Sequence, residues 1–250
     1  MIDAVAFSLG SIDVRWYGIL FALGALLGYI LVKKVCHEFK ISSSDTEDFF
    51  LYGLVSGLIG ARLFEVFFYD PSYYFSEPLK IFAVWEGGLA SHGALIGILL
   101  CALWFSKKRN ISFWSLTDLF TLPVALAAGF VRIGNFINQE LVGTLSSLPW
   151  AVRFDQYEGL RHPVQIYQSL SHFSLFAFFY LKRSWFMQKK GRLFLSWLLS
   201  YSVLRFFLEF LKDLPKEYGL FYFGMNLAQY ASLILIVCSI YGLYCVQLRT

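Results

Sequence analysis

The hydrophobic positions of this chain form long apolar stretches, which short polar loops separate. A helix that crosses a bilayer needs about 20 predominantly apolar residues. Seven stretches approach that length, so the pattern predicts seven transmembrane helices. They cover residues 16–35, 48–69, 88–105, 115–134, 165–183, 193–212 and 226–246.

The basic residues of the loops predict how these helices are oriented. Most loop Lys and Arg residues fall in the first, third and fifth loops, for example Lys33, Lys107 and Arg183, whereas the alternate loops hold few. Such residues concentrate on the cytoplasmic side of a membrane. We therefore expect the N-terminus outside and the C-terminus inside. An odd number of helices agrees with this, because it places the two ends of the chain on opposite sides.

The composition agrees with a membrane protein. Hydrophobic residues make up 58% of the 250 residues and charged residues only 15%, whereas about a quarter of the residues in a soluble domain are charged. The net charge of +4 lies in particular loops, so it indicates orientation rather than a nucleic-acid surface. The predicted fold class is all-α: a polytopic protein with one integral-membrane domain over residues 1–250, surrounded by a lipid bilayer. The longest loop, 135–164, is expected to form a small cap on the outer face.

Several polar residues stand at the end of the fourth apolar stretch. Arg132 and Asn135 are three residues apart and face the same way, and Asn138 and Glu140 follow. An ionisable residue inside a membrane is costly to bury, so it is a candidate for a functional site. Asn138 is equally well explained as a helix cap. Glycines permit either a close backbone approach or a break in the helix here; they stand at positions 129, 134 and 143.

Two further arginines fall inside predicted helices. Tyr201, Arg205 and Glu209 have a spacing of four residues, which places them on one helix face. We favour a functional interpretation here, because Tyr201 adds a hydroxyl to the same face. Arg62 precedes Glu65 by three residues, and an internal ion pair is a sufficient explanation for that pair.

Other polar residues gather at the predicted outer ends of the helices. His92 stands near the start of the third helix, Tyr17 in the first and Arg161 before the fifth. A lone histidine is commonly structural, but a neutral imidazole on this side could take a proton near neutral pH. Arginine forks match phosphate geometry. The set therefore points to an anionic partner such as a phospholipid headgroup.

The segment Gly-Phe-Val-Arg-Ile-Gly-Asn-Phe-Ile-Asn-Gln-Glu at 129–140 closely resembles the signature of bacterial prolipoprotein diacylglyceryl transferases. Further matches follow in the same order along the chain, so the resemblance runs nearly end to end. These are Arg15-Trp-Tyr-Gly18, Trp85-Glu-Gly-Gly88, His92-Gly93, Arg161-His-Pro163 with Gln165 and Tyr167, Tyr201, Arg205-Phe206, Glu209-Phe210 and Gln229.

The resemblance implies an enzyme of the bacterial inner membrane, with its active site toward the outer side and without a metal or an organic cofactor. Its substrates would be phosphatidylglycerol and the lipobox peptide of a prolipoprotein. It would transfer diacylglycerol to a cysteine thiol, form a thioether and release glycerol phosphate. By the same resemblance Arg132 and Arg205 would engage the phosphate. From the chemistry of the residues we expect His92 to be the base, whereas Glu140 could instead be the base or only orient Arg132. The substrate-binding residues would be Tyr17, Asn135, Asn138, Arg161, Tyr201 and Glu209.

The chain departs from the family pattern at two positions. Ala94 stands where a second glycine usually follows His-Gly, and Gln168 stands where the family usually has a glutamate. Two other functions compete with the transferase. A transporter of an anionic lipid or solute would also use buried arginines, although no internal repeat is found. A seven-helix receptor would fit the orientation but does not need this cluster of polar residues.

Overall fold

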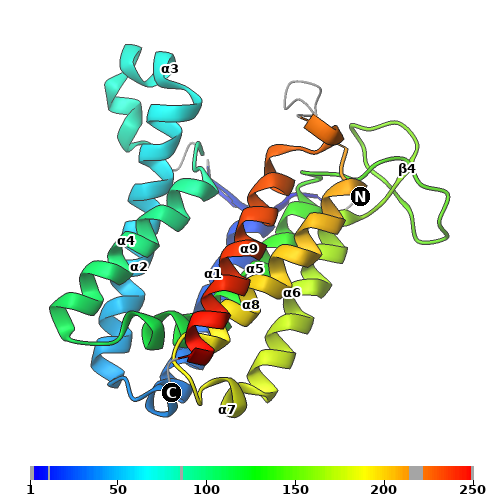
Figure 1. Ribbon diagram of the computed structural model, residues 1–250. Helices are drawn as coiled ribbons and strands as arrows, with labels where there is room; N and C mark the ends of the chain where they lie inside the picture. Colours follow the sequence, from blue (N-terminus) through cyan, green and yellow to red (C-terminus); the bar gives the residue numbers. More distant parts are fainter. Residues whose placement is uncertain (1–2, 11, 85–86, 214–221, 249–250) are drawn as a thin grey trace. The chain divides into compact units, whose positions relative to one another are not determined.

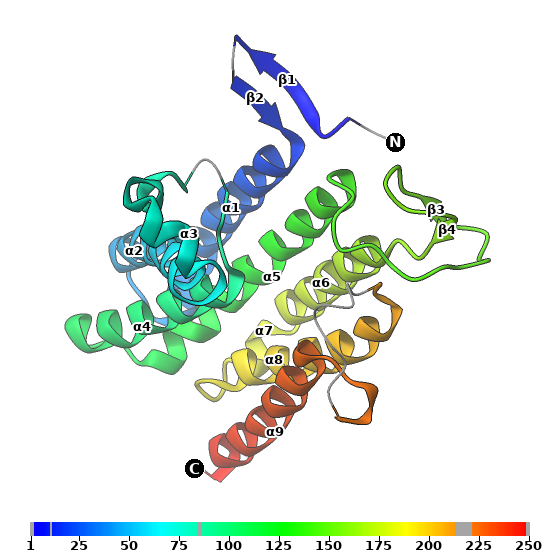
Figure 2. The ribbon, with the colours of Figure 1, turned by 90° about the horizontal axis from the view of Figure 1, so that it is seen from above.

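The computed structural model describes residues 3–10, 12–84, 87–213 and 222–248 (Figures 1 and 2). The chain forms two compact units, of which one combines Met1–Val32 with Phe120–Thr250 and the other is Lys33–Leu119. Two helices, α1 (Trp16–Val35) and α5 (Phe113–Ile137), run through the boundaries between the units along the chain. A single domain over the whole chain stays a prediction.

The described residues contain a long helix at each of the seven predicted positions. Besides α1 and α5 these are α2 (Ser43–Phe64), α4 (Ser91–Arg109), α6 (Val164–Leu181), α8 (Arg192–Leu208) and α9 (Leu227–Leu248). Short helical segments extend or connect them: η1 (Cys36–Phe39), η2 (Glu65–Tyr69), α3 (Pro71–Ser76), η3 (Pro78–Phe82), α7 (Arg183–Phe186), η5 (Glu209–Leu211) and η7 (Tyr222–Gly224).

Five helical segments of the described chain are long and apolar enough to cross a membrane. They are Trp16–Phe39, Ser43–Tyr69, Phe113–Ile137, Arg192–Leu211 and Leu227–Leu248. The other two long helices, α4 and α6, are less apolar. Three basic residues end α4, and α6 carries glutamines, serines and a histidine. The seven helices thus exist, and five of them are candidate membrane spans by length and composition.

In the unit that contains both termini, α8 packs on α6 and on α9 (Figures 1 and 2). Helix α1 approaches α5 closely at two glycines. A Cβ atom at Gly24 would lie 3.0 Å from the Cα of Ala127, and one at Gly28 would lie 3.0 Å from the Cβ of Pro123. Small residues allow such close helix packing in membranes, where the contact is driven by van der Waals forces.

The same unit contains two short hairpins that the all-α prediction did not include. Strand β1 (Val5–Leu9) pairs antiparallel with β2 (Ile12–Arg15), and β3 (Val152–Arg153) pairs with β4 (Leu160–Arg161). The second hairpin lies in the predicted cap. The cap is tied to the segment after α8, because Thr144 donates its N–H to the carbonyl of Leu211 at 2.9 Å.

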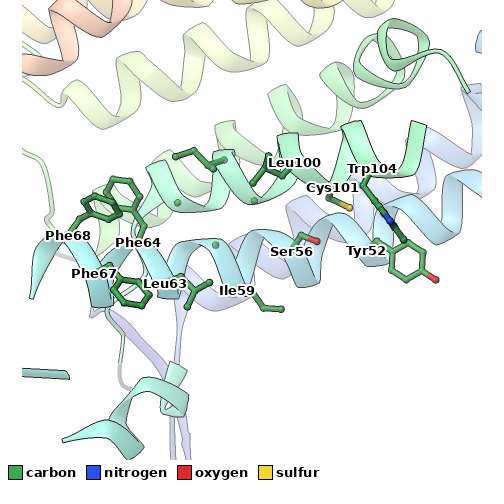
Figure 3. A pocket seen from close by; sticks show the side chains of 14 residues that line it. Tyr52, Ser56, Ile59, Leu63, Phe64, Phe67, Phe68, Leu100, Cys101 and Trp104 are labelled. Atoms are coloured by element: carbon green, nitrogen blue, oxygen red, sulfur yellow. The ribbon is translucent and has the colours of Figure 1, made fainter. Parts of the chain in front are cut away.

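In the other unit, α2 packs along α4 through glycines. A Cβ atom at Gly60 or Gly93 would collide with the backbone of the other residue, and one at Gly97 would collide with the backbone of Ser56. On the α4 side, the glycine contacts thus involve Gly93 and Gly97. Ala94, which departs from the family pattern, lies between these two glycines. An apolar groove of about 800 Å³ runs along the two helices (Figure 3).

Arg62 is buried in this unit, and its guanidinium binds backbone carbonyls of η3 and of Ala83, Gly87 and Gly88. Its Nε donates to the carbonyl of Ile81 at 2.9 Å, and its Nη1 donates to the carbonyl of Gly87 at 2.6 Å and to the hydroxyl of Tyr74 at 3.1 Å. The carbonyls of Lys80, Ala83 and Gly88 also accept from it. The predicted ion pair with Glu65 is not among the described contacts of Arg62. Backbone carbonyls of a distant segment take its place.

Candidate active site

The first part of the site is a chain of hydrogen bonds at the end of α5. Arg132 donates from Nη1 to the Oδ1 of Asn135 at 3.2 Å. The Nδ2 of Asn135 donates to Glu140 Oε2 at 2.8 Å, and the Nδ2 of Asn138 donates to Glu140 Oε1 at 3.1 Å. The structure thus brings together the four residues that the sequence singled out in this segment.

The local backbone explains how Glu140 returns to Asn135. Helix α5 runs unbroken through Gly134 and ends at Ile137. Gln139 and Leu141 then adopt left-handed backbone conformations, each with φ of 56°, which are uncommon for residues other than glycine. The N–H of Glu140 donates to the carbonyl of Asn135 at 2.9 Å, so the carboxylate lies over the helix end.

The glycines of α5 serve close approach and do not break the helix. A Cβ atom at Gly134 would lie 2.8 Å from the ring of Tyr17, and one at Gly129 would lie 2.5 Å from the ring of Phe173. Tyr17 thereby comes near enough to interact electrostatically with Arg132 and Glu140. The structure thus supports a close approach at Gly129 and Gly134, rather than a break in the helix.

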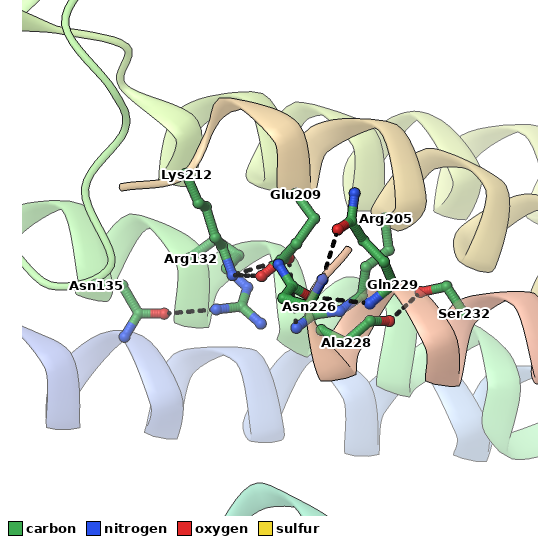
Figure 4. Close-up of polar contacts among 9 residues, drawn as sticks. All are labelled: Arg132, Asn135, Arg205, Glu209, Lys212, Asn226, Ala228, Gln229 and Ser232. Carbon is green, nitrogen blue, oxygen red and sulfur yellow. Dashed lines mark hydrogen bonds and ion pairs between the residues drawn. The ribbon is translucent and has the colours of Figure 1, made fainter. Parts of the chain in front are cut away.

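The second part of the site lies at the end of α8. Arg205 Nη2 is 3.8 Å from Glu209 Oε2, and Lys212 Nζ is 3.1 Å from the same oxygen (Figure 4). Glu209 and Lys212 are both buried. The sequence analysis missed Lys212, although its spacing of three residues from Glu209 is a readable signal.

A small cavity joins the two parts. Its walls come from α5, α6 and α8, and both Arg132 and Arg205 line it. Its volume of about 10 Å³ is roughly the space that one water molecule needs. The structure therefore places the two arginines of the predicted phosphate clamp at one cavity. Its lining residues are Arg132, Gln168, Ser171, His172, Tyr201, Leu204, Arg205 and Leu208.

His172 is a second residue of this site that the sequence analysis missed. Its ring stacks on Tyr201 with centroids 5.3 Å apart, and Tyr201 stacks in turn on Trp197 at 5.4 Å. The one available signal was a spacing of four residues from Gln168, the position that departs from the family pattern. A histidine in an apolar helix does not by itself indicate a site. Only the packing of α6 against α8 shows that His172 lies beside Tyr201.

Arg161 occupies a different place from the arginines of the cavity. Its Nη1 donates to the carbonyl of Gly143 at 3.0 Å and lies 2.5 Å from Asp213 Oδ2. These contacts join β4 to the start of the cap and to the segment after α8. A role of Arg161 in substrate binding stays a prediction.

His92 belongs to the other unit, where it lies in the first turn of α4. Its side chain lies outside the part of the chain that the structure describes, as do Trp85 and Glu86 of the nearby motif. Among the described residues, no group of three or more His, Cys, Asp or Glu side chains could hold a metal ion.

Comparison with known proteins shows which family the chain belongs to. Residues 4–245 match the family model for prolipoprotein diacylglyceryl transferase. The chain belongs to the prolipoprotein diacylglyceryl transferase family. A phosphatidylglycerol–prolipoprotein diacylglyceryl transferase of Chloroherpeton thalassium is 42% identical over 218 residues, which cover 85% of this chain and 81% of the relative. A protein of the same name from Bordetella parapertussis is 36% identical over 254 residues, which cover 97% and 94% of the two chains.

A third relative of that name, from Porphyromonas gingivalis, is 35% identical over 96% of this chain and 91% of its own. Membership of this family makes the chain a membrane transferase involved in lipoprotein biosynthesis. The resemblance found in the sequence is therefore confirmed at the level of the family and of the enzyme class.

Proposed function

We propose that this chain transfers the diacylglyceryl group of phosphatidylglycerol to the lipobox cysteine of prolipoproteins. One observation carries the proposal: Arg132 and Arg205, from different helices, line the same small cavity. Planar guanidinium groups bind phosphate through paired hydrogen bonds. The relatives whose names state this reaction cover nearly the whole chain, which favours the same substrates here.

In the proposed reaction, negative charge develops on the phosphate as glycerol phosphate leaves. The substrate thiol, with an unperturbed pKa of about 8.5, reacts as its thiolate. Its sulfur bonds to the glyceryl carbon while the bond from that carbon to the phosphate oxygen breaks. Both electrons of the broken bond leave with glycerol phosphate, and the thiol proton goes to a base of the enzyme. Preorganised positive groups stabilise such a leaving charge most where it develops.

The proton acceptor in this proposal is His92, and Glu140 is the alternative. Glu140 is linked to Arg132 through Asn135, so it either takes the proton itself or orients the arginine. Near-normal transfer by a His92→Gln variant would remove His92 from the role of base and leave Glu140.

We further propose that all seven helices cross the bacterial inner membrane, with the N-terminus outside and the C-terminus inside. The loop charges support this orientation. The cap at 135–164 and the active site would then face the outer side, where secreted prolipoproteins present their lipobox. The substrate-binding roles of Tyr17, Asn135, Asn138, Arg161, Tyr201 and Glu209 are part of the same proposal.

The direct test uses purified protein in lipid vesicles with labelled phosphatidylglycerol and a synthetic lipobox peptide. The expected product is a peptide whose cysteine carries diacylglycerol through a thioether, as identified by mass spectrometry. Arg132→Leu and Arg205→Leu should each abolish the product while the protein keeps its thermal stability. Movement of labelled lipid across a vesicle membrane without a covalent product would overturn the proposal in favour of a lipid transporter.

A further inference from the structure

Two buried side chains that line the arginine cavity have polar atoms without a partner. Gln168 is 5% exposed, and neither its Oε1 nor its Nε2 has a hydrogen-bond partner among the described residues. His172 is 6% exposed, and its Nδ1 is likewise unpaired within the described structure. Both residues lie on α6, one helical turn apart, and both line the cavity beside Arg132 and Arg205.

Unpaired polar atoms of this kind need an explanation. A buried donor or acceptor without a partner costs about 1–3 kcal/mol, and native proteins contain few of them. Three such atoms in one cavity indicate that a ligand or a water molecule completes their hydrogen bonds. The volume of about 10 Å³ is enough for one oxygen atom with its hydrogen at these groups.

The chemistry of the two side chains restricts what that oxygen can be. An amide both donates and accepts hydrogen bonds, and so does a neutral imidazole. Both therefore match a hydroxyl, which also does both, better than they match a phosphate oxygen, which only accepts. The guanidinium groups of Arg132 and Arg205 beside them disfavour an ammonium group, because like charges at close range repel.

We infer that Gln168 and His172 bind a terminal hydroxyl of the lipid headgroup while the two arginines hold its phosphate. The pair would then select a polyol headgroup, such as glycerol, over a headgroup that ends in an ammonium, such as ethanolamine. The inference rests on the proposed function and deepens it by naming the residues that distinguish the headgroup alcohol. Gln168 stands at one of the two positions where the chain departs from the family pattern.

The test compares two soluble anions as inhibitors of the transfer reaction. Glycerol 1-phosphate carries the phosphate and the hydroxyls, whereas methyl phosphate carries only the phosphate. The wild-type protein should bind glycerol phosphate at least about tenfold more tightly, because only this ligand completes the buried hydrogen bonds. Gln168→Met and His172→Phe, which keep the approximate shape of each side chain, should lose that preference and raise the KM for phosphatidylglycerol. Inhibition by methyl phosphate should stay the same.

Two further variants separate recognition from folding. His172→Gln keeps a donor and an acceptor, so it should retain more of the preference than His172→Phe. Ser239→Ala removes a buried, unpaired hydroxyl of α9 that is not among the residues lining the cavity, and it should leave both inhibition constants unchanged. If Gln168→Met and His172→Phe still bind glycerol phosphate more tightly than methyl phosphate, as the wild-type protein does, the inference is overturned. A structural water is then left as the occupant of the cavity.

Calorimetric binding of the two anions distinguishes this inference from the proposed function. A wild-type protein that transfers no lipid but binds glycerol phosphate more tightly than methyl phosphate would overturn the transferase reaction and retain the hydroxyl site. A protein that transfers lipid but binds both anions equally would retain the reaction and overturn the hydroxyl site.

Discussion

Asn135 donates a hydrogen bond from its side-chain amide to Glu140 at 2.8 Å, and its amide oxygen accepts from Arg132 at 3.2 Å. The uncharged side chain of Asn135 thus lies between Arg132 and Glu140, which could otherwise form a direct ion pair. Because Asn135 is buried, it fixes the position of the Arg132 guanidinium and leaves that group free of a direct contact with Glu140 among the described hydrogen bonds.

Asn135→Ala should therefore reduce kcat by about 100-fold, because a displacement of about 1 Å in a catalytic group has that effect. Steady-state transfer assays with phosphatidylglycerol and a lipobox peptide would measure the loss. Gln247→Ala, an exposed change near the end of α9, is the control and should keep normal kinetics. Normal kcat in Asn135→Ala would show that the bridge does not position Arg132.

Replacing either arginine of the cavity with lysine should show that the planar fork matters beyond its charge. Arg132→Lys and Arg205→Lys keep one positive charge but lose the paired donors that match phosphate. We expect kcat to fall by about 100-fold or more, as for the loss of one transition-state donor elsewhere, while thermal stability changes little. Activity near that of the wild-type protein in both variants would mean that charge alone suffices.

Arg62→Leu should destabilise the unit around α2 and α4. The change removes all donors of a buried guanidinium that binds the segment from Lys80 to Gly88, and each hydrogen bond to a charged group contributes about 1.5–3 kcal/mol. A loss of at least about 3 kcal/mol in the free energy of unfolding is expected. Thermal unfolding and limited proteolysis of this segment would detect it.

Arg62→Lys is the matched variant for that experiment. It keeps the positive charge and has three donors on one nitrogen, so it can reach fewer of the carbonyls. Its stability should lie between those of the wild-type protein and Arg62→Leu. Equal stability of all three proteins would contradict the structural role assigned to Arg62.

Gly97→Val should separate α2 from α4. A Cβ at this position would collide with the carbonyl of Ser56, and overpacking typically costs about 1–3 kcal/mol. The expected result is a lower Tm in detergent. Leu95→Val, which changes an exposed residue of the same helix, should leave the Tm almost unchanged. A similar Tm for the two variants would contradict the close packing of these helices.

The sequence by itself determined the helices, because a membrane span must satisfy its backbone hydrogen bonds internally and cover about 20 apolar residues. Those requirements are local, so the seven positions could be predicted within a few residues. Five of them are also long and apolar enough to cross a membrane. The segment from Arg132 to Glu140 was equally readable, because its polar residues interrupt an apolar stretch.

Tertiary structure decided which polar groups meet. Only the packing of α5, α6 and α8 brings Arg132, Arg205 and His172 to one cavity. The order of residues along the chain carries no such information. Arg62 shows the same limit: its spacing suggested Glu65, whereas folding supplied carbonyls about 20 residues away. The physical reason is that periodicity fixes the face of a helix, but only packing determines what that face contacts.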